Sequence, residues 1–246
     1  MTSKLIFWLR IIIFFTVNYF QLDDYALAQS IAENKYGLFV TNDTSNFKST
    51  VDADTNKRMV DIRNCLPGII LDLTYATVNN FMHQPLYPSL NTTYLRKTAI
   101  AALLKVLKEL KGQHLTIKIF DAYRPYSVTE KMWEVVKDDR YAADPAKGSA
   151  HNRGAAVDLT LVDIATKKEL SMGTGFDNFS DTAHTDFTAL PLAILKNRAV
   201  LKSTMEKYGF ISLNTEWWHF SLANASAFEL LDLSFDDLKK MRKQCN

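Results

Sequence analysis

The stretch Ser149-Ala-His-Asn-Arg-Gly-Ala-Ala-Val-Asp158 joins a turn of small and polar residues to the start of an apolar run. Far downstream, Glu216-Trp-Trp-His219 supplies a second histidine and a further carboxylate. Two histidines and one aspartate form a ligand set that Zn²⁺ accepts, and a set of three leaves one coordination position for water. These two motifs therefore predict a catalytic zinc site with the ligands His151, Asp158 and His219.

Glu216 is the candidate acid/base of this site, because a free carboxylate beside a zinc ligand can take a proton from water and later deliver it to a leaving amine. In a regular strand, residues three apart point to opposite faces. Glu216 and His219 can therefore converge only if the chain turns between them, and the sequence does not show such a turn. Gly154 gives the first motif the freedom to bend between His151 and Asp158.

Two more charged residues have both a functional and a structural interpretation. Arg124 is followed by Pro125, which favours extended backbone at Arg124. Its guanidinium could stabilise the oxyanion that forms when water adds to a carbonyl, although an ion pair with Asp121 is the better interpretation of Arg124 taken alone. Asp177 follows two glycines on a predicted loop. It could reach the ammonium group of a ligand, or it could cap a turn.

The composition is that of a globular enzyme, since 47% of the 246 residues are hydrophobic and 23% are charged. The formal net charge of +2 is too small to favour a nucleic-acid partner. The remaining histidines lack a carboxylate at comparable spacing, and a lone histidine is more often a surface or core residue than a ligand. They are His83, His114 and His184.

Hydrophobic periodicity predicts an α+β fold. We expect one compact domain in which a mainly antiparallel central sheet is flanked by helices and holds the zinc site in a central cavity. Ser127-Val-Thr-Glu130 has the spacing of a capping box, which predicts a helix start. The other helices and strands follow from periods of 3.6 and 2 residues. The expected helices cover residues 100–110, 128–140, 191–208 and a last helix from 234, and the expected strands cover 66–73, 115–120, 155–162 and 217–222.

The chain divides into three segments. Residues 1–28 resemble a secretory signal peptide, with Lys4 and Arg10 before a short apolar stretch and a small-x-small site before Gln29. Residues 29–60 are polar and are expected to form a loose N-terminal extension, and residues 61–246 form the catalytic domain. Export makes a disulfide between Cys65 and Cys245 feasible, but the sequence leaves this pairing open.

Five blocks of sequence resemble the VanX-type D-alanyl-D-alanine dipeptidases, which are zinc enzymes of the D-Ala-D-Ala metallopeptidase clan. The resemblance spans roughly residues 72–222. It implies that His151, Asp158 and His219 bind one zinc ion and that Glu216 is the acid/base. The blocks are Tyr75-Ala-Thr-Val-Asn-Asn-Phe81, Asp121-Ala-Tyr-Arg-Pro125, Ser149 to Thr160, Met172-Gly-Thr-Gly-Phe-Asp177 and Glu216-Trp-Trp-His219.

The resemblance also implies a small-molecule substrate, the free dipeptide D-Ala-D-Ala. It implies that Arg124 stabilises the tetrahedral intermediate, that Asp177 meets the ammonium group of the dipeptide, and that Ser149 and Tyr75 line the pocket. With a cleaved signal peptide, the enzyme would be periplasmic or secreted, without stable membrane association. We therefore expect a role in cell-wall turnover or scavenging.

Two other functions fit part of the pattern. A zinc D,D- or L,D-carboxypeptidase that trims peptidoglycan stems would use a similar metal set in an open groove. A non-catalytic binding module could keep the zinc fold, but such proteins usually lose the base or the oxyanion donor. Both Glu216 and Arg124 are present here, which favours an enzyme.

Overall fold

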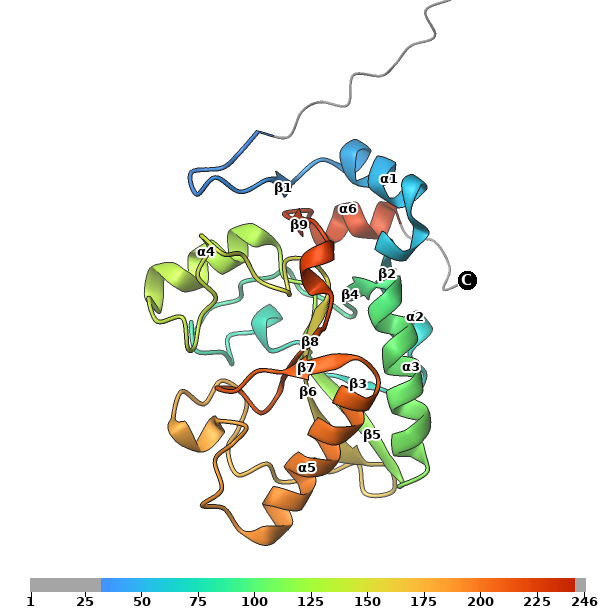
Figure 1. The fold of residues 1–246 in the computed structure, drawn as a ribbon, viewed down its shortest axis with the longest axis vertical. Coiled ribbons are helices and arrows are strands. Elements are labelled where there is room, and N and C mark those ends of the chain that lie inside the picture. The colour runs from blue at the N-terminus through green and yellow to red at the C-terminus, as the bar shows by residue number, and fades with distance from the viewer. Residues whose placement is uncertain (1–31, 242–246) are drawn as a thin grey trace, which may run out of the picture. The chain divides into compact units, whose positions relative to one another are not determined.

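The central sheet has five strands in the order β3-β5-β6-β8-β7 in a computed structural model that describes residues 32–241 (Figure 1). β3 runs parallel to β5, while the pairs β5-β6, β6-β8 and β8-β7 are antiparallel. The sheet is therefore mixed, with antiparallel pairs in the majority. Its strands are β3 (Ile70–Leu71), β5 (Leu115–Asp121), β6 (Ala156–Asp163), β7 (Phe210–Ser212) and β8 (His219–Leu222).

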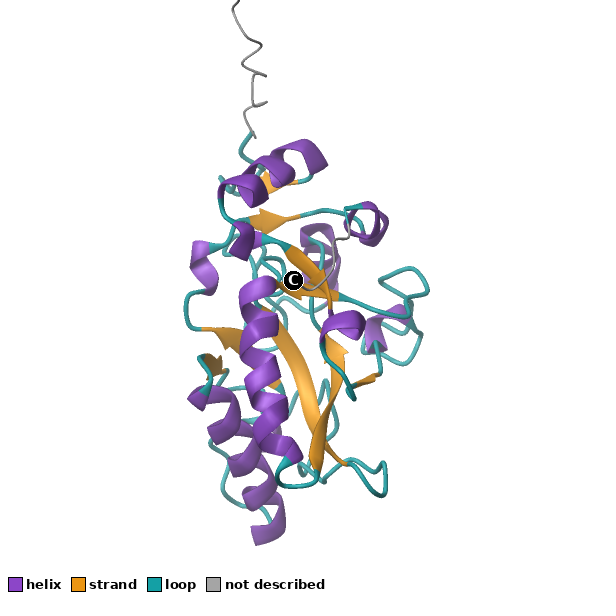
Figure 2. Cartoon of the chain, turned by 90° about the vertical axis from the view of Figure 1, so that its right-hand side faces the viewer, coloured by secondary structure: helices purple, strands orange, loops and turns teal. Residues whose placement is uncertain are grey.

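Two long helices cover one face of this sheet. Figure 2 shows α3 (Lys97–Lys111) and α5 (Leu192–Lys207) running side by side against the strands. Apolar residues at helical spacing in α3 are buried, including Leu103, Leu107 and Leu110. The burial of this stripe against the sheet is the main reason why the segment stays helical.

The alternation of side chains along β6 separates the core from the site. Val157, Leu159 and Leu161 belong to the hydrophobic cluster that also contains the buried residues of α3. Successive side chains of a strand point to opposite faces, so Asp158 and Thr160 point away from that cluster. The β6 strand thus buries apolar residues on one face and presents a carboxylate on the other.

Two small sheets and several short helices complete the described chain. β1 (Val40–Thr41) pairs in parallel with β9 (Leu230–Leu231), and β2 (Met59–Asp61) pairs antiparallel with β4 (Tyr94–Arg96). The remaining α-helices are α1 (Thr44–Ala53), α2 (Ile62–Cys65), α4 (Tyr126–Val135) and α6 (Phe235–Lys240), and 3-10 turns cover Thr55–Lys57, Thr74–Ala76, Asp181–Ala183 and Ala225–Ala227.

The segment predicted as a loose extension, residues 29–60, contains regular structure within its described part. Helix α1 buries Phe47, which is 2% exposed, in a second hydrophobic cluster with Tyr123 and Phe235. The sequence hides this helix because eight of its ten residues are polar or small, and only Phe47 and Val51 contact the cluster. The expectation of a loose segment is corrected accordingly.

The predicted helices and strands are confirmed with shifted ends. The last helix begins where expected, with a capping box between Ser234 and Asp237. The capping box predicted at Ser127 is wrong. Helix α4 begins at Tyr126, two residues before the predicted start at 128, and the Ser127 hydroxyl donates to Asp232 at 2.7 Å instead. The same helix ends at Val135, short of the predicted residue 140, and the first predicted strand is reduced to β3.

The predicted signal peptide and one of the two cysteines lie outside the part of the chain that the structure describes. The signal peptide, residues 1–28, lies outside the described residues. Cys65 is buried and disulfide-bonded, whereas Cys245 lies outside the described residues. No helix within residues 32–241 is long and apolar enough to cross a membrane.

Candidate metal centre and active site

The register of the sheet brings two of the predicted ligands, Asp158 and His219, together. Asp158 in β6 lies directly opposite His219 in β8, and on its other side it is paired with Asp121 in β5. Side chains that are directly opposite in an antiparallel pair have Cβ atoms roughly 4.5–5.5 Å apart. The pairing therefore places a carboxylate and an imidazole at one point, although 61 residues separate them in the chain.

His151 reaches the same point from the turn that precedes β6. Gly154 in this turn has a φ of +64°, and a Cβ there would come within 2.5 Å of the Met59 side chain. Only glycine accepts both this conformation and this close approach. The His151 ring Nδ1 lies 2.6 Å from the backbone oxygen of Ala122. This contact holds the proton on Nδ1 and leaves the lone pair of Nε2 for a ligand.

The three side chains form a group that could hold a metal ion, with all ligand atoms within 4.8 Å of one another. His151 Nε2 lies 3.1 Å from His219 Nδ1 and 3.3 Å from Asp158 Oδ2, and His219 Nδ1 lies 3.0 Å from Asp158 Oδ1. Ligands about 2.0–2.2 Å from a tetrahedral zinc are roughly 3.3–3.5 Å apart. The donor types and their separations fit this ion.

The protonation states of the group also suit a cation. Burial lowers the pKa of His219, which favours the neutral, ligating form of the imidazole. Burial alone would raise the pKa of Asp158, but His151 and His219 outweigh it and hold the pKa below its usual value. The group thus presents one anionic carboxylate between two imidazoles.

Glu216 lies beside this group because the chain does turn between Glu216 and His219. The backbone N–H of His219 donates to the backbone oxygen of Glu216 at 3.3 Å, which closes a turn at the start of β8. Glu216 Oε2 is thereby 4.0 Å from His219 Nδ1. Burial, together with the charges of Asp158 and Asp177, raises the pKa of Glu216. A bound divalent cation would oppose this shift, because it favours the carboxylate.

Arg124 also borders the group, and it does make the ion pair with Asp121. Its Nε and Nη2 donate to Asp121 Oδ2 at 3.1 and 2.9 Å, and Nη2 is 3.9 Å from Asp158 Oδ2. The guanidinium is thus held beside Asp158 by its bonds to Asp121. The structural and functional interpretations of Arg124 are thus compatible, since the ion pair aims the guanidinium.

Asp177 and Tyr75 meet at the edge of the site. The Tyr75 hydroxyl donates to Asp177 Oδ1 at 2.9 Å, and the Tyr75 ring lies 5.2 Å from the Arg124 guanidinium. Asp177 Oδ2 is buried without a hydrogen-bond partner among the described residues. Burial raises the pKa of Asp177 to about 7. An unpaired buried acceptor of this kind is suited to a cationic ligand group.

Ser149 is part of the turn that carries His151. Its hydroxyl accepts a hydrogen bond from the His151 backbone N–H at 3.2 Å. Neighbouring Asn152, which is completely buried, donates to the Arg124 backbone oxygen at 3.0 Å. The turn and the Arg124 segment are therefore fastened to each other.

Sequence reasoning missed two supporting residues. Tyr87 donates its hydroxyl to both oxygens of Asp121, at 2.9 and 3.1 Å, and so orients the partner of Arg124. Asn152 lies within the stretch 149–158, but the sequence indicates no role for it. Neither residue has a local pattern that distinguishes it, because each acts through a contact that is distant in sequence.

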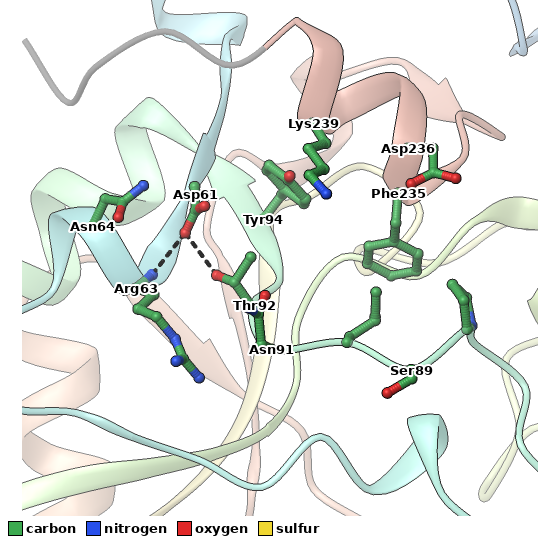
Figure 3. Close-up of a pocket in the computed structure, with 12 residues that line it drawn as sticks. Asp61, Arg63, Asn64, Ser89, Asn91, Thr92, Tyr94, Phe235, Asp236 and Lys239 are labelled. Atoms are coloured by element: carbon green, nitrogen blue, oxygen red, sulfur yellow. Dashed lines mark hydrogen bonds between the residues drawn. The ribbon is translucent and has the colours of Figure 1, made fainter.

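Other polar features lie apart from this group. His83 and His114 occupy turns with φ of 53° and 58°, and neither belongs to the metal-binding group. Figure 3 shows a pocket bounded by β2, β4 and α6, where Asp61 accepts hydrogen bonds from the Arg63 backbone and the Thr92 hydroxyl. None of the candidate site residues lines this pocket.

A group of two histidines and one aspartate with an adjacent glutamate is typical of a metallohydrolase. Comparison with known proteins specifies which one. Residues 55–240 match the M15 peptidase family, described as D-ala-D-ala dipeptidase. The chain belongs to this family and is a metallopeptidase.

Two curated relatives extend this result. The D-alanyl-D-alanine dipeptidase of Escherichia coli (strain K12) is 35% identical over 179 residues, which cover 73% of this chain and 91% of that protein. The D-alanyl-D-alanine dipeptidase of Enterococcus faecalis (strain ATCC 700802 / V583) is 28% identical, over 64% of this chain and 87% of that protein. Among solved structures, the LdcB LD-carboxypeptidase matches 62% of this chain and 71% of its own at 20% identity, with a TM-score of 0.36.

Proposed function

We propose that this protein hydrolyses free D-alanyl-D-alanine to two D-alanines with one zinc ion held by His151, Asp158 and His219. The observation that carries the proposal is the convergence of these three side chains within 4.8 Å, with Glu216 4.0 Å from His219. The names of the family and of its relatives supply the substrate.

In this mechanism the side chains of the chain handle protons and charge. When bound, zinc would act as a Lewis acid and lower the pKa of water to roughly 7. Glu216 takes a proton from the attacking water while the oxygen of that water bonds to the carbonyl carbon. The carbon–nitrogen bond then breaks, and Glu216 delivers the proton to the leaving amine. The Arg124 guanidinium donates to the oxyanion that develops at the carbonyl oxygen.

The charges around the site suit a small zwitterion. Asp177 would receive the ammonium group, with Tyr75 beside it, and Ser149 would lie toward the opposite end. Asp177 also lines a pocket with Phe81, Phe176 and Asn79, which would admit the dipeptide. We propose that the site closes into a cavity that excludes polymeric peptidoglycan.

The N-terminal 28 residues lead us to propose export to the periplasm or the exterior, and a role in recovering D-Ala-D-Ala from wall turnover. An exported enzyme does not reach the cytoplasmic pool of this dipeptide. Expression with and without residues 1–28 in a glycopeptide-sensitive bacterium tests the idea. Resistance conferred by the full-length, exported chain would contradict it.

The decisive experiment combines zinc analysis with hydrolysis assays on the purified chain. We expect one zinc per chain and release of D-alanine from free D-Ala-D-Ala, with little release from a pentapeptide stem. Preference for the stem would support the carboxypeptidase alternative. Zinc binding without hydrolysis of either compound would support a non-catalytic binding module.

A further inference from the structure

The loop that carries Asp177 is closed at both ends by one buried arginine. Arg198 projects from α5 and is 6% exposed. Its Nε donates to the backbone oxygen of Met172 at 2.7 Å, and Met172 precedes Asp177 in the chain. Its Nη2 and Nη1 donate to the oxygens of Thr182 and His184, both at 2.8 Å, after Asp177.

Arg198 has no carboxylate partner within residues 32–241. Taking a guanidinium out of water is costly unless hydrogen bonds replace its hydration. Here three backbone oxygens replace it, and all three belong to the loop of residues 172–184. An arginine used in this way holds the loop in one conformation more firmly than an apolar side chain of similar size could.

Other contacts strengthen the same closure. The Trp217 indole N–H donates to the Thr174 hydroxyl at 2.8 Å, and its backbone N–H donates to the Ala183 oxygen at 3.0 Å. The Arg198 guanidinium lies 6.0 Å from the Trp217 ring. Trp217 directly follows Glu216, so the loop is tied to the segment that carries the proposed acid/base.

The backbone and the neighbours of Asp177 show how the middle of this loop is held. The Asp177 φ of 56° lies in the left-handed region, which costs free energy for a residue other than glycine, although aspartate tolerates it better than most. Phe176 beside it stacks on Phe120 with the ring centroids 4.7 Å apart. The middle of the loop is thus placed by packing, and its two ends are placed by Arg198.

We propose that Arg198 is a positioning residue for substrate binding, which fixes the Asp177 carboxylate where the ammonium group of the dipeptide is held. This inference rests on the proposed function, and in particular on the ammonium role of Asp177. Arg198 touches neither substrate nor metal. Its effect therefore passes through Asp177 and appears in KM rather than in kcat.

The test is a double-mutant cycle with Arg198→Met and Asp177→Asn, measured on D-Ala-D-Ala. We expect Arg198→Met to raise KM about tenfold to 100-fold, with kcat within about threefold and zinc content unchanged. In the Asp177→Asn background, the same change should raise KM less than twofold, because the carboxylate that Arg198 places is gone. Arg198→Lys should recover part of the loss.

Two controls separate this role from a general loss of stability. Arg96→Met removes another buried arginine that donates to backbone oxygens, those of Lys57, Arg153 and Glu229, so it should lower the melting temperature without the KM pattern. Lys202→Met changes an exposed residue of α5 and should change nothing. Should Arg198→Met not fold, Thr174→Val loosens the same loop by one bond and should raise KM in the same direction.

The inference is overturned if folded Arg198→Met keeps the KM of the parent, if kcat falls while KM stays, or if the KM increase persists in full without Asp177. Failure of the parent enzyme to hydrolyse D-Ala-D-Ala would instead refute the proposed function. The two failures are therefore distinguishable in one series of measurements.

Discussion

The two sides of the active site are built in different ways. The metal side stands on paired strands, where the register of β6 and β8 sets Asp158 against His219, and a tight turn adds His151. The Asp177 side stands on a loop between Met172 and His184 that is held by bonds from Arg198 and Trp217 to its ends. We infer that the first side is rigid by construction, whereas the second can be adjusted by changes in few contacts.

The largest effect should come from breaking the metal side itself. His219→Ala leaves two ligands, and we expect loss of bound zinc and of measurable hydrolysis, because a structural or catalytic zinc needs at least three protein donors. Metal analysis after gel filtration, together with the activity assay, measures this. Retention of a full zinc equivalent in a folded variant would contradict the ligand assignment.

Glu216→Ala sharpens the comparison, because it spares the metal ligands. We expect zinc to stay bound and kcat to fall by roughly 10²–10⁴, the usual contribution of a general acid/base. Single-turnover kinetics on the zinc-loaded variant check this expectation. Activity equal to that of the parent would remove Glu216 from the mechanism.

Arg124→Met removes a donor that borders both sides of the site. We expect kcat to fall by about 10²–10³, with the greater part of the effect in kcat. Asp121 then remains buried without its cation, so a lower melting temperature should accompany the loss. Arg124→Lys keeps the charge but not the paired donors to Asp121, and intermediate activity is expected. A change confined to KM would assign Arg124 to binding instead.

The smallest effect should be the pH dependence of the Asp177 side. Because burial raises the pKa of Asp177 to about 7, the carboxylate that meets the ammonium group is lost as pH falls below this value. KM for D-Ala-D-Ala should therefore increase below pH 7, by at most about tenfold per unit. Asp177→Asn should show a high KM without this dependence. The same increase in the variant would point to another group.

Asp177 should also make the free energy of unfolding depend on pH. Its pKa is higher in the folded chain than the ordinary 3.8, so the folded state binds this proton more tightly. The contribution of Asp177 to the free energy of unfolding is thus greatest below pH 4 and decreases as pH rises toward 7. Comparing urea titrations of the parent and Asp177→Asn at several pH values measures this difference.

The sequence predicts the metal side of the site better than the Asp177 side. Spacing and residue type were enough to predict that His151, Asp158 and His219 lie together, because ligand chemistry is specific and strand pairing turns periodicity into position. The turn that brings Glu216 to His219 has no local signature. The contacts of Arg198 could not be predicted from the sequence for a different reason. Its acceptors are backbone oxygens, which every residue has.

The two corrected predictions have a common cause as well. Ser127 has the right spacing for a capping box, but it lies inside helix α4, and its hydroxyl donates to Asp232, which is 105 residues away. Helix α1 reads as a polar extension because a single aromatic residue, Phe47, accounts for most of its burial. In both places a distant contact overrides the local pattern.

The pairing of β1 with β9 has a consequence for biosynthesis. Val40 pairs with Leu230, and the backbone N–H of Leu231 donates to the oxygen of Asn152, beside His151. These contacts cannot form until residue 231 has been synthesised. The turn around His151 therefore gains the support of Leu231 only after most of the chain has been made, and such contacts between distant parts of the sequence slow folding. A ribosome that stops before Leu230 would release a chain whose catalytic centre is left unbraced.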